Sequence, residues 1–451
     1  MNYKKWSYEE WLKDQVSINE RRIRRIEENP DPVKLKSNKM IYQAERDLRL
    51  SELVALREGK PWISYPGAGM GDLFRAMGFE FSGAGGLNEK SSNELLRQSR
   101  DAYSAAGYPE QVCDLAVCST AWTVLGIYPK MSCFIHCNAT CQPMADSTTA
   151  VGLSHGAPIF NLTAPMDPHS DEDIAYVTEQ LRDLIPWVEK NVPGAHYSEE
   201  RLKEWLDAEE RLFKNYHRIW ETRKHKPCPQ TARDSFREEM PAYMHPNKED
   251  VVEWSRLWAE EMEERIATGT HLPKERIRLA WTNTGPIYDH DLFPWLEEQG
   301  VTIPAFIWPG LDNLFSISPE CDLIAEAKEK KLSPLEQVAQ IMCLCSINGL
   351  GDRLMHNYIE TARAQDVDGF VFYANRGCVQ QQGVMGLVAQ QVREQLGIPF
   401  LVIKGTQVDE RGYDKADTML RLGAFLELVL ASKARRGQHA SASTKKSNVK
   451  A

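Results

Sequence analysis

The sequence predicts an α/β fold with two Rossmann-like (flavodoxin-like) parallel-sheet domains, a helical insert and N-terminal helices. Three observations indicate this fold. The chain has 451 residues, which exceeds the usual limit of a single hydrophobic core. Short apolar runs alternate with helix-like segments in two parts of the chain, which is typical of parallel sheets. A long charged stretch with helical periodicity and few strand signals separates those two parts.

The first 58 residues are expected to form helices. Residues 6–28 carry Trp6, Trp11, Ile23 and other apolar residues among many charges, as in an irregular amphipathic helix. The run "ENPDP" ends this helix, and a second helix is expected at about 33–57. In "GKPWISYPGAG", Pro61 and the apolar residues after it then indicate the first strand of an α/β unit.

The first α/β domain is expected over residues 59–170. In it, "GDLFRAMGFEF" indicates a helix and then a strand, "KMSCFIHCNATCQPM" a strand and loop, "ADSTTAVGLSHG" a helix, and "APIFNLTAP" a strand. Residues 171–272 form the helical region, with segments such as "SEERLKEWLDAEERLFKNYHRIWETRK". The second α/β domain, 273–431, contains four apolar runs: "RIRLAWTNTGP", "VTIPAFIWPG", "VDGFVFYANRG" and "IPFLVIKGTQ". The basic, Ser/Ala/Lys-rich tail, 432–451, is expected to be disordered.

Charge and composition exclude some classes of partner. The formal charge of -10 argues against nucleic acid, which requires a basic face. No apolar run reaches transmembrane length and the N-terminus lacks a signal-peptide core, so a cytoplasmic protein without a membrane partner is expected. The ten cysteines then indicate reduced thiols or metal ligands rather than disulfides. Five of them cluster in one stretch: Cys113, Cys118, Cys133, Cys137 and Cys141.

The run "ANRGC" places Cys378 where a predicted strand, 367–374, leads into a predicted helix, 384–397. Ligands gather at the carboxyl ends of parallel strands, so chemistry is expected there. The alternative is a small buried residue, because a cysteine packs like one. Cys141, past the strand in "CNATC", and Cys113, at a helix start after "GYP", occupy comparable positions. If the two domains face each other, the three thiolates can converge, and they suit an iron-sulfur cluster with one iron open to another ligand.

Motifs for other chemistry are weak. "GAGMGD", residues 67–72, lacks the spacing of a dinucleotide loop, and "GAGGLNEKS" lacks the Gly-Lys pair of a phosphate loop. Cys133, Cys137 and Cys141 have the CxxxCxxxC spacing, but their flanking residues indicate strand and loop rather than one helical face. His136 and His155 stand alone and are more readily interpreted as packed or exposed histidines than as metal ligands.

The sequence from about residue 61 to 429 resembles the 2-hydroxyacyl-CoA dehydratase and benzoyl-CoA reductase family. The resemblance rests on "WISYPGAGMGDLFRAMGFE", "GYPEQVC", "CNATC", "APIFNLTAP", "RIRLAWTNTGP", "DGFVFYANRGC" and "LGIPFLVIKGTQVDERGY". Each piece alone is weakly specific, whereas their order and spacing together are strong evidence for the family. The resemblance implies two Rossmann-like domains, a helical region, and an iron-sulfur cluster, expected to be [4Fe-4S], on three cysteines.

Carried over by motif, the cluster ligands are Cys113, Cys141 and Cys378, and Ser64 is expected to offer the open iron an oxygen. The resemblance also implies an acyl-CoA substrate and a paralogous cluster subunit in a heterodimer. Reactions of the family send one low-potential electron into a CoA thioester and form a ketyl-type radical anion. A separate ATP-hydrolysing iron-sulfur activator delivers that electron, which is consistent with a chain that has no recognisable phosphate loop.

The sequence departs from the family pattern near the expected site. Lys404 and Thr406 stand where Asp is common, Glu410 stands where Pro is common, and "VQQQG" after Cys378 lacks the Lys frequent in dehydratases. Aromatic residues at expected strand ends favour a flat acyl ring: Phe372, Tyr373, Trp281 and Trp308. Aromatic residues in such positions are also typical of a core.

The main hypothesis is therefore the cluster subunit of an ATP-coupled benzoyl-CoA reductase, which reduces an aromatic acyl-CoA to a cyclic dienoyl-CoA. The candidate proton donors, by placement, are His136, Tyr373 and Glu410. The first alternative is a 2-hydroxyacyl-CoA dehydratase subunit, which would form an enoyl-CoA. Two further alternatives remain: an iron-sulfur scaffold or electron-transfer protein without a substrate site, and a metal-free α/β protein with packed cysteines.

Overall fold

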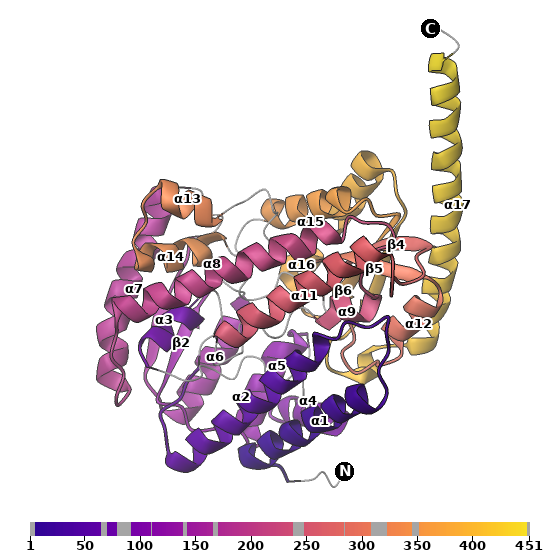
Figure 1. Cartoon of the computed structure of the whole chain (residues 1–451). Helices are drawn as coiled ribbons and strands as arrows, with labels where there is room; N and C mark the ends of the chain where they lie inside the picture. Colours follow the sequence, from indigo (N-terminus) through magenta and orange to yellow (C-terminus); the bar gives the residue numbers. More distant parts are fainter. Residues whose placement is uncertain are drawn as a thin grey trace.

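The computed structural model shows two parallel β-sheets flanked and joined by helices (Figure 1). It describes residues 5–64, 70–78, 92–109, 111–138, 142–165, 170–237, 248–283, 285–307, 323–344 and 351–448. The α/β class with parallel sheets is confirmed. The strand expected in "GFEF", 78–81, lies almost wholly outside the described residues. No helix in the described part of the chain combines the length and apolar character that a membrane crossing requires.

The first sheet has the strand order β1-β2-β3, and its strands are parallel. They are β1 (Ile63–Ser64), β2 (Cys133–Cys137) and β3 (Ile159–Leu162). The helices of this unit are α3 (Gly71–Ala76), α4 (Asn93–Ala105), α5 (Asp114–Val124) and α6 (Gln142–His155). Alternation along β2 directs Cys133 and Cys137 into one core and Phe134 into another. The expectation of strand rather than helix at these cysteines is confirmed.

The second sheet has the order β5-β4-β6-β7, again with parallel strands. The four apolar runs predicted from sequence form β4 (Ile277–Thr282), β5 (Val301–Ile307), β6 (Gly369–Asn375) and β7 (Phe400–Gly405). The later helices are α12 (Leu292–Glu298), α13 (Leu323–Glu329), α14 (Pro334–Leu344), α15 (Asp352–Ala364), α16 (Val379–Gln391) and α17 (Lys415–Asn448). A π-helical turn at Val392–Leu396 extends α16, and a 3-10 turn at Glu410–Gly412 precedes α17.

Strand β6 is buried over its whole length. Tyr373 packs with Trp281 in the core beneath α17, and Phe372 packs on the opposite face with residues of α15 and α16. The expectation that these aromatic residues line a substrate pocket is wrong, because helices cover both faces of the sheet and all three side chains are fully buried. Trp308, the fourth residue of that expectation, lies outside the described residues.

The N-terminal helices α1 (Tyr8–Glu28) and α2 (Asn38–Glu58) pack against each other and against the first α/β unit. Ser7 begins α1 with a capping box, in which its hydroxyl and the Glu10 carboxylate accept each other's backbone N–H. Trp11 of α1 meets Trp122 of α5 edge-on, with ring centroids 5.4 Å apart. The apolar periodicity of residues 6–28 thus reflects a helix face buried on this unit.

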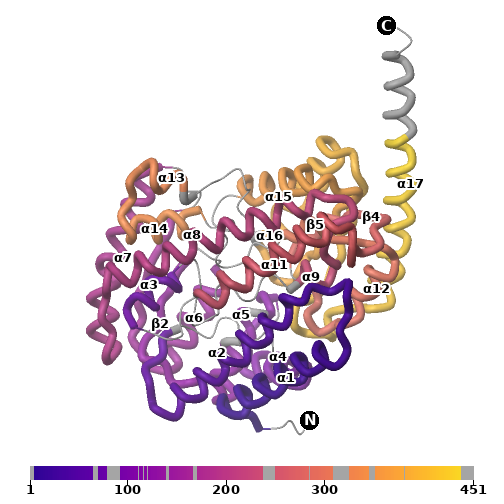
Figure 2. Tube along the Cα trace, viewed as in Figure 1, coloured from indigo at the N-terminus to yellow at the C-terminus, as the bar shows by residue number. Residues whose placement is uncertain are grey.

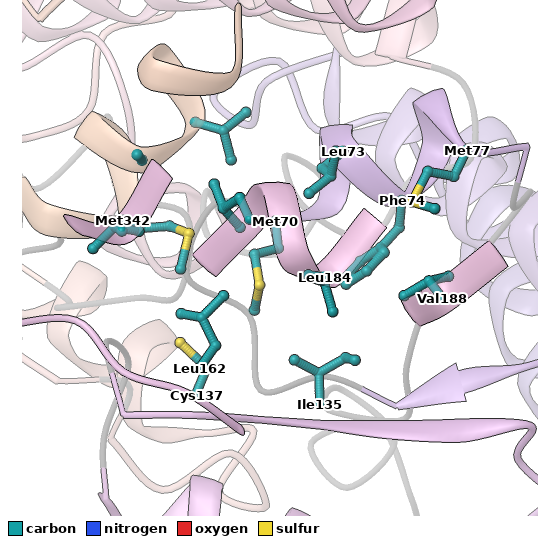
Figure 3. Close-up of a cluster of buried hydrophobic side chains, with 14 of the residues drawn as sticks. Met70, Leu73, Phe74, Met77, Ile135, Cys137, Leu162, Leu184, Val188 and Met342 are labelled. Atoms are coloured by element: carbon teal, nitrogen blue, oxygen red, sulfur yellow. The ribbon is translucent and has the colours of Figure 1, made fainter. Parts of the chain in front are cut away.

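The helical region contains α7 (Asp171–Asn191), α8 (Glu199–Thr222), α9 (Ala232–Arg237) and α11 (Lys248–Thr268). Helices α8 and α11 form a pair with their own aromatic core. Helix α7 instead lies on the first sheet, where Leu184 and Val188 share a core with Ile135 and Cys137 (Figure 3). Met342 of α14 enters the same core, so part of the segment expected in the second domain packs against the first.

Helix α17 covers the second sheet with its first half and then extends away from the body of the protein (Figures 1 and 2). Residues from 432 onward were expected to be disordered, whereas α17 continues through that segment as far as Asn448. Lys433 and Arg436 explain the difference, because their side chains bind Asp368 at 2.7 and 3.3 Å. These ion pairs hold the first turn of the basic tail against the sheet, and its alanines and lysines favour helix.

Candidate active site

Cys113 and Cys378 each stand immediately before a helix. Cys378 follows β6 and is the N-cap of α16, and Cys113 is the N-cap of α5. The backbone of Gln381, in the first turn of α16, hydrogen-bonds to the Cys378 thiol. The unpaired N–H groups of a first helical turn favour a thiolate over a thiol at such a position.

Gly377 brings the loops of these two cysteines into contact. Its φ of +79° is a left-handed conformation that favours glycine. A Cβ atom at this position would lie 2.4 Å from the backbone nitrogen of Cys113 and 2.5 Å from the carbonyl carbon of Val112. The loop after β6 can therefore reach the start of α5 only because residue 377 has no side chain. The two cysteines lie on loops that touch across the two α/β units.

Burial governs the ionisation of the thiols in this region. Burial raises the pKa of Cys378, and a hydrogen bond from the backbone of Gln381 acts in the opposite direction. Cys118, inside α5, has a pKa well above its usual range, because of burial first and the nearby Asp114 second. Coordination to a metal would reverse this direction at Cys378, since a coordinated thiol loses its proton.

Two glutamines of "VQQQG" hold the start of α16 to the sheet. The Gln381 side-chain carbonyl accepts a hydrogen bond of 2.5 Å from Asn283 Nδ2, just past β4. Gln382 donates to the backbone carbonyl of Asn375, the last residue of β6. These amides therefore have a structural role, and the absence of a lysine in this run does not by itself indicate an aromatic substrate.

Four charged side chains, here called the charge quartet, lie beside the two cysteine loops: Arg100, Asp114, Arg376 and Asp409. Arg100 and Asp114 come from the first α/β unit, and the other two come from the second. The Asp114 carboxylate lies 3.5 Å from Arg100 and 3.7 Å from Arg376, and Asp409 lies 3.9 Å from each arginine. Burial raises the pKa of Asp114 to about 6, although both arginines act against this shift.

A second layer of polar contacts surrounds the quartet. Arg411 donates to Asp409 at 2.9 Å and to Asp101 of α4 at 2.6 Å. Glu410 is paired with Arg97 and accepts a hydrogen bond of 3.2 Å from Asn93, both on α4. Glu410 therefore joins the loop after β7 to the first unit. Its expected role as a proton donor stays a prediction, now for a carboxylate already engaged by a cation.

Tyr373 lies in the core rather than on an open surface. Its hydroxyl donates a hydrogen bond of 2.8 Å to the backbone carbonyl of Thr406, which also accepts one of 3.0 Å from Tyr288. Burial, with a smaller effect of Tyr288, raises the pKa of Tyr373 far above its usual value. The phenol is therefore held neutral, and its proton points at a carbonyl oxygen.

Replacing Tyr373 by phenylalanine should lower the free energy of unfolding by about 1 kcal/mol, the usual net value of one hydrogen bond. The Thr406 carbonyl keeps Tyr288 as a donor, so no buried acceptor is left unpaired. Urea denaturation of Tyr373→Phe and Tyr358→Phe makes the comparison. In the described structure the buried Tyr358 hydroxyl has no hydrogen-bond partner, so its removal should not destabilise the protein. Equal losses in both variants would contradict this assignment.

His136 lies on the face of β2 that α6 covers. Its Nδ1 is 2.8 Å from the hydroxyl of Thr149 on α6. This position lies within β2 and not in the loop that follows it. Its role as a proton donor also stays a prediction.

Other expected site residues fall outside the description. Cys141 lies between described segments, and only the backbone of Ser64 is described, at the end of β1. Within the described ranges no three His, Cys, Asp or Glu side chains lie close enough together to hold a metal ion. Cys113 and Cys378, two of the three expected cysteine ligands, lie on loops that touch. The roles of Cys141 and Ser64 stay predictions.

The charge quartet is the part of the site that sequence reasoning missed. Asp114 directly follows Cys113 and Arg376 precedes Cys378 by two residues, so a charge beside each candidate ligand was a usable signal. Asp409 lies in a stretch that matches the family. Arg100 carries no such signal, because only the packing of α4 brings it to its partners.

Comparison with known proteins identifies the family. The family model described as 2-hydroxyglutaryl-CoA dehydratase, D-component, matches residues 72–429. The chain belongs to this family. The resemblance found from sequence motifs is thereby confirmed, and so is the expectation of an enzyme subunit of this family.

Three curated relatives are dehydratase subunits. The (R)-phenyllactyl-CoA dehydratase alpha subunit of Clostridium sporogenes is 22% identical over 341 residues, covering 73% of this chain and 79% of the relative. The lactoyl-CoA dehydratase subunit alpha of Anaerotignum propionicum is 24% identical and covers 61% and 62%. The (R)-2-hydroxyglutaryl-CoA dehydratase subunit alpha of Acidaminococcus fermentans is 22% identical and covers 67% and 61%. These relatives support the dehydratase alternative better than the main hypothesis of a benzoyl-CoA reductase.

Proposed function

We propose that this chain is the cluster-binding subunit of a 2-hydroxyacyl-CoA dehydratase, with an iron-sulfur cluster held by Cys113, Cys141 and Cys378. The observation that carries the proposal is the contact of Gly377 with the backbone of Cys113, which joins two cysteine loops from different α/β units. Such convergence is unnecessary if each cysteine is a separate packing residue. The curated relatives, all dehydratase subunits, support the reaction class.

The described residues fit the proposed cluster. Cys113 and Cys378 are soft ligands at two helix N-termini, where the helix dipole stabilises negative charge. Gly377 leaves no side chain between their loops. The third thiolate would come from Cys141 in the loop after β2, and Ser64 at the end of β1 is the proposed oxygen donor to the open iron. A [4Fe-4S] cluster with three cysteine ligands leaves one iron open in this way.

The chain itself would position the cluster and the thioester, exclude water from the site and control the charge around the cluster. When bound, the cluster would supply a low-potential electron to the acyl thioester. Tyr288 and Tyr373 hold the loop after β7 through the Thr406 carbonyl, and Gln381 holds the start of α16 through Asn283. These contacts fix the loops at the carboxyl ends of β4, β6 and β7, where ligands bind in open parallel sheets.

The proposal includes two protein partners. One is a paralogous cluster subunit in a heterodimer, in line with relatives that are named as alpha subunits. The other is a separate ATP-hydrolysing iron-sulfur activator, since no phosphate-loop motif is recognisable in the sequence. The proposed substrate is an acyl-CoA thioester.

Electron accounting separates the dehydratase from the reductase. Dehydration of a 2-hydroxyacyl-CoA to an enoyl-CoA and water is redox-neutral and consumes no electrons. Reduction of an aromatic ring to a diene consumes two electrons per ring. The subunit should therefore be purified anaerobically with its partner and activator, then supplied with ATP and a limiting amount of reductant. We expect enoyl-CoA from lactoyl-CoA, (R)-phenyllactyl-CoA or (R)-2-hydroxyglutaryl-CoA in excess of the electrons added.

Two controls define the outcome. Omitting ATP or the activator should abolish turnover. Benzoyl-CoA should be consumed at least about tenfold more slowly than the best 2-hydroxyacyl-CoA, a difference of about 1.4 kcal/mol in activation free energy. Dienoyl-CoA formation from benzoyl-CoA at two electrons per ring, without dehydration of any hydroxyacyl-CoA, would return the assignment to the reductase.

A further inference from the structure

The charge quartet has a geometry that hydrogen bonding alone does not explain. All four of its ion pairs have nitrogen-oxygen distances of 3.5–3.9 Å, longer than a normal hydrogen bond. Both carboxylate oxygens of Asp114 are buried, and neither has a hydrogen-bond partner in the described part of the chain. Its side chain is only 2% exposed. Asp114 is therefore a buried carboxylate held by the charges around it.

The arginines that compensate Asp114 come from both sides of the contact between the units. Arg100 reaches it from α4, and Arg376 reaches it from the loop between β6 and Cys378. The backbone N–H of Arg376 donates a hydrogen bond of 2.8 Å to the carbonyl of Gly405 at the end of β7, which fixes its loop. Arg376 thus carries a positive charge two residues from one cysteine, directed at a carboxylate adjacent to the other.

We propose that Arg376 and Asp114 are positioning residues that set the reduction potential of the centre bound by Cys113 and Cys378. This inference rests on the proposed function, because it requires a cluster on these cysteines. Adding an electron to a cluster adds negative charge. A fixed positive charge nearby makes that step easier, a fixed buried carboxylate makes it harder, and the low local dielectric preserves both effects.

The geometry sets the relative size of the two effects. Asp114 is buried and adjacent to a ligand, so its charge is weakly screened. The Arg376 side chain is 40% exposed, so solvent screens part of its charge. Removing the carboxylate should therefore change the potential more than removing the guanidinium. The two changes should have opposite signs.

The test is the midpoint potential of the cluster, measured at pH 8 by redox titration followed by electron paramagnetic resonance on anaerobically purified protein. Asp114→Asn should favour the reduced form about tenfold, which is about 59 mV upward for a one-electron couple. Arg376→Gln should favour the oxidised form about threefold, or about 28 mV downward. The double variant should return toward the wild-type potential. Arg211→Gln, which removes an exposed ion-paired arginine between α8 and α11, should leave the potential unchanged.

Iron and sulfide content, measured in parallel, separates the possible failures. A purely structural role would lower stability or iron content and leave the potential of the remaining cluster unchanged, which would overturn the inference. If Arg376→Gln does not retain iron, Arg376→Lys and Asp114→Asn decide the matter. Lysine should keep a potential close to wild type, and an unchanged or lower potential in Asp114→Asn would overturn the inference. Wild-type protein without iron and sulfide would overturn the proposed function as well.

Discussion

Replacing Cys378 by alanine should lower the iron and acid-labile sulfide of the anaerobically purified protein by at least about tenfold, since changes outside the ligand shell alone weaken metal binding 10–100-fold. Cys378 begins α16 at the carboxyl end of β6, and its loop touches that of Cys113. A thiol placed there only for packing would not affect iron content. Cys113→Ala and Cys141→Ala should have the same effect.

The matched controls are Cys228→Ala and Cys343→Ala. Both cysteines are buried, burial raises the pKa of each thiol to about 12, and neither belongs to the proposed ligand set. These variants should lose stability through the small cavity that they create but keep their iron. Iron, sulfide and visible absorbance are measured on the same preparations. Full iron content in Cys378→Ala, or equal losses in the controls, would remove Cys378 from the ligand set.

Replacing Gly377 by alanine should destabilise the protein by more than about 3 kcal/mol, because a backbone clash adds to the strain of a left-handed residue. The new Cβ would lie 2.4 Å from the Cys113 nitrogen, and backbone atoms cannot move aside as a flexible side chain can. Relief of the clash requires the two cysteine loops to separate. Iron content should therefore fall together with stability.

Gly397→Ala isolates the contribution of the clash. Gly397 also has a positive φ, +62°, but a Cβ atom there would meet nothing within 4 Å. Its substitution should destabilise by only about 1–2 kcal/mol, the usual strain of a left-handed residue, and should leave iron content unchanged. Urea denaturation and iron assays on both variants give the comparison. Equal effects in the two variants would show that the two cysteine loops do not meet as described.

The periodicities of the sequence predicted correctly, in most places, whether a segment forms a helix or a strand. The runs that became β4 to β7 are apolar throughout because helices cover both faces of a parallel sheet, and that burial is visible in composition alone. The N-terminal helices were predicted within a few residues because their buried faces repeat at helical spacing. The thiols Cys113 and Cys378 could be singled out because each stands where one local pattern gives way to another.

Tertiary packing decided whether the aromatic residues belong to a pocket or to the core. The local sequence around Phe372, Tyr373 and Trp281 is compatible with either a pocket or a core. The helices that cover the two faces of the sheet place these side chains in the core. Packing likewise placed α7 and α14 on the first sheet, because an apolar helix face does not specify its partner. Composition did not predict the structure of the tail either. Its residues suggested disorder, whereas Asp368 binds Lys433 and Arg436 in its first turn.

The sequence by itself determined the family, the α/β class and the cysteines worth testing, because local patterns and motif order record each of these. The tertiary structure decided which of these residues meet. The contact of Gly377 with Cys113 joins residues more than 250 positions apart, and the pairing of Arg376 with Asp114 does the same. Local periodicity carries no information about such distances, because they are set by how two sheets and the helices between them pack.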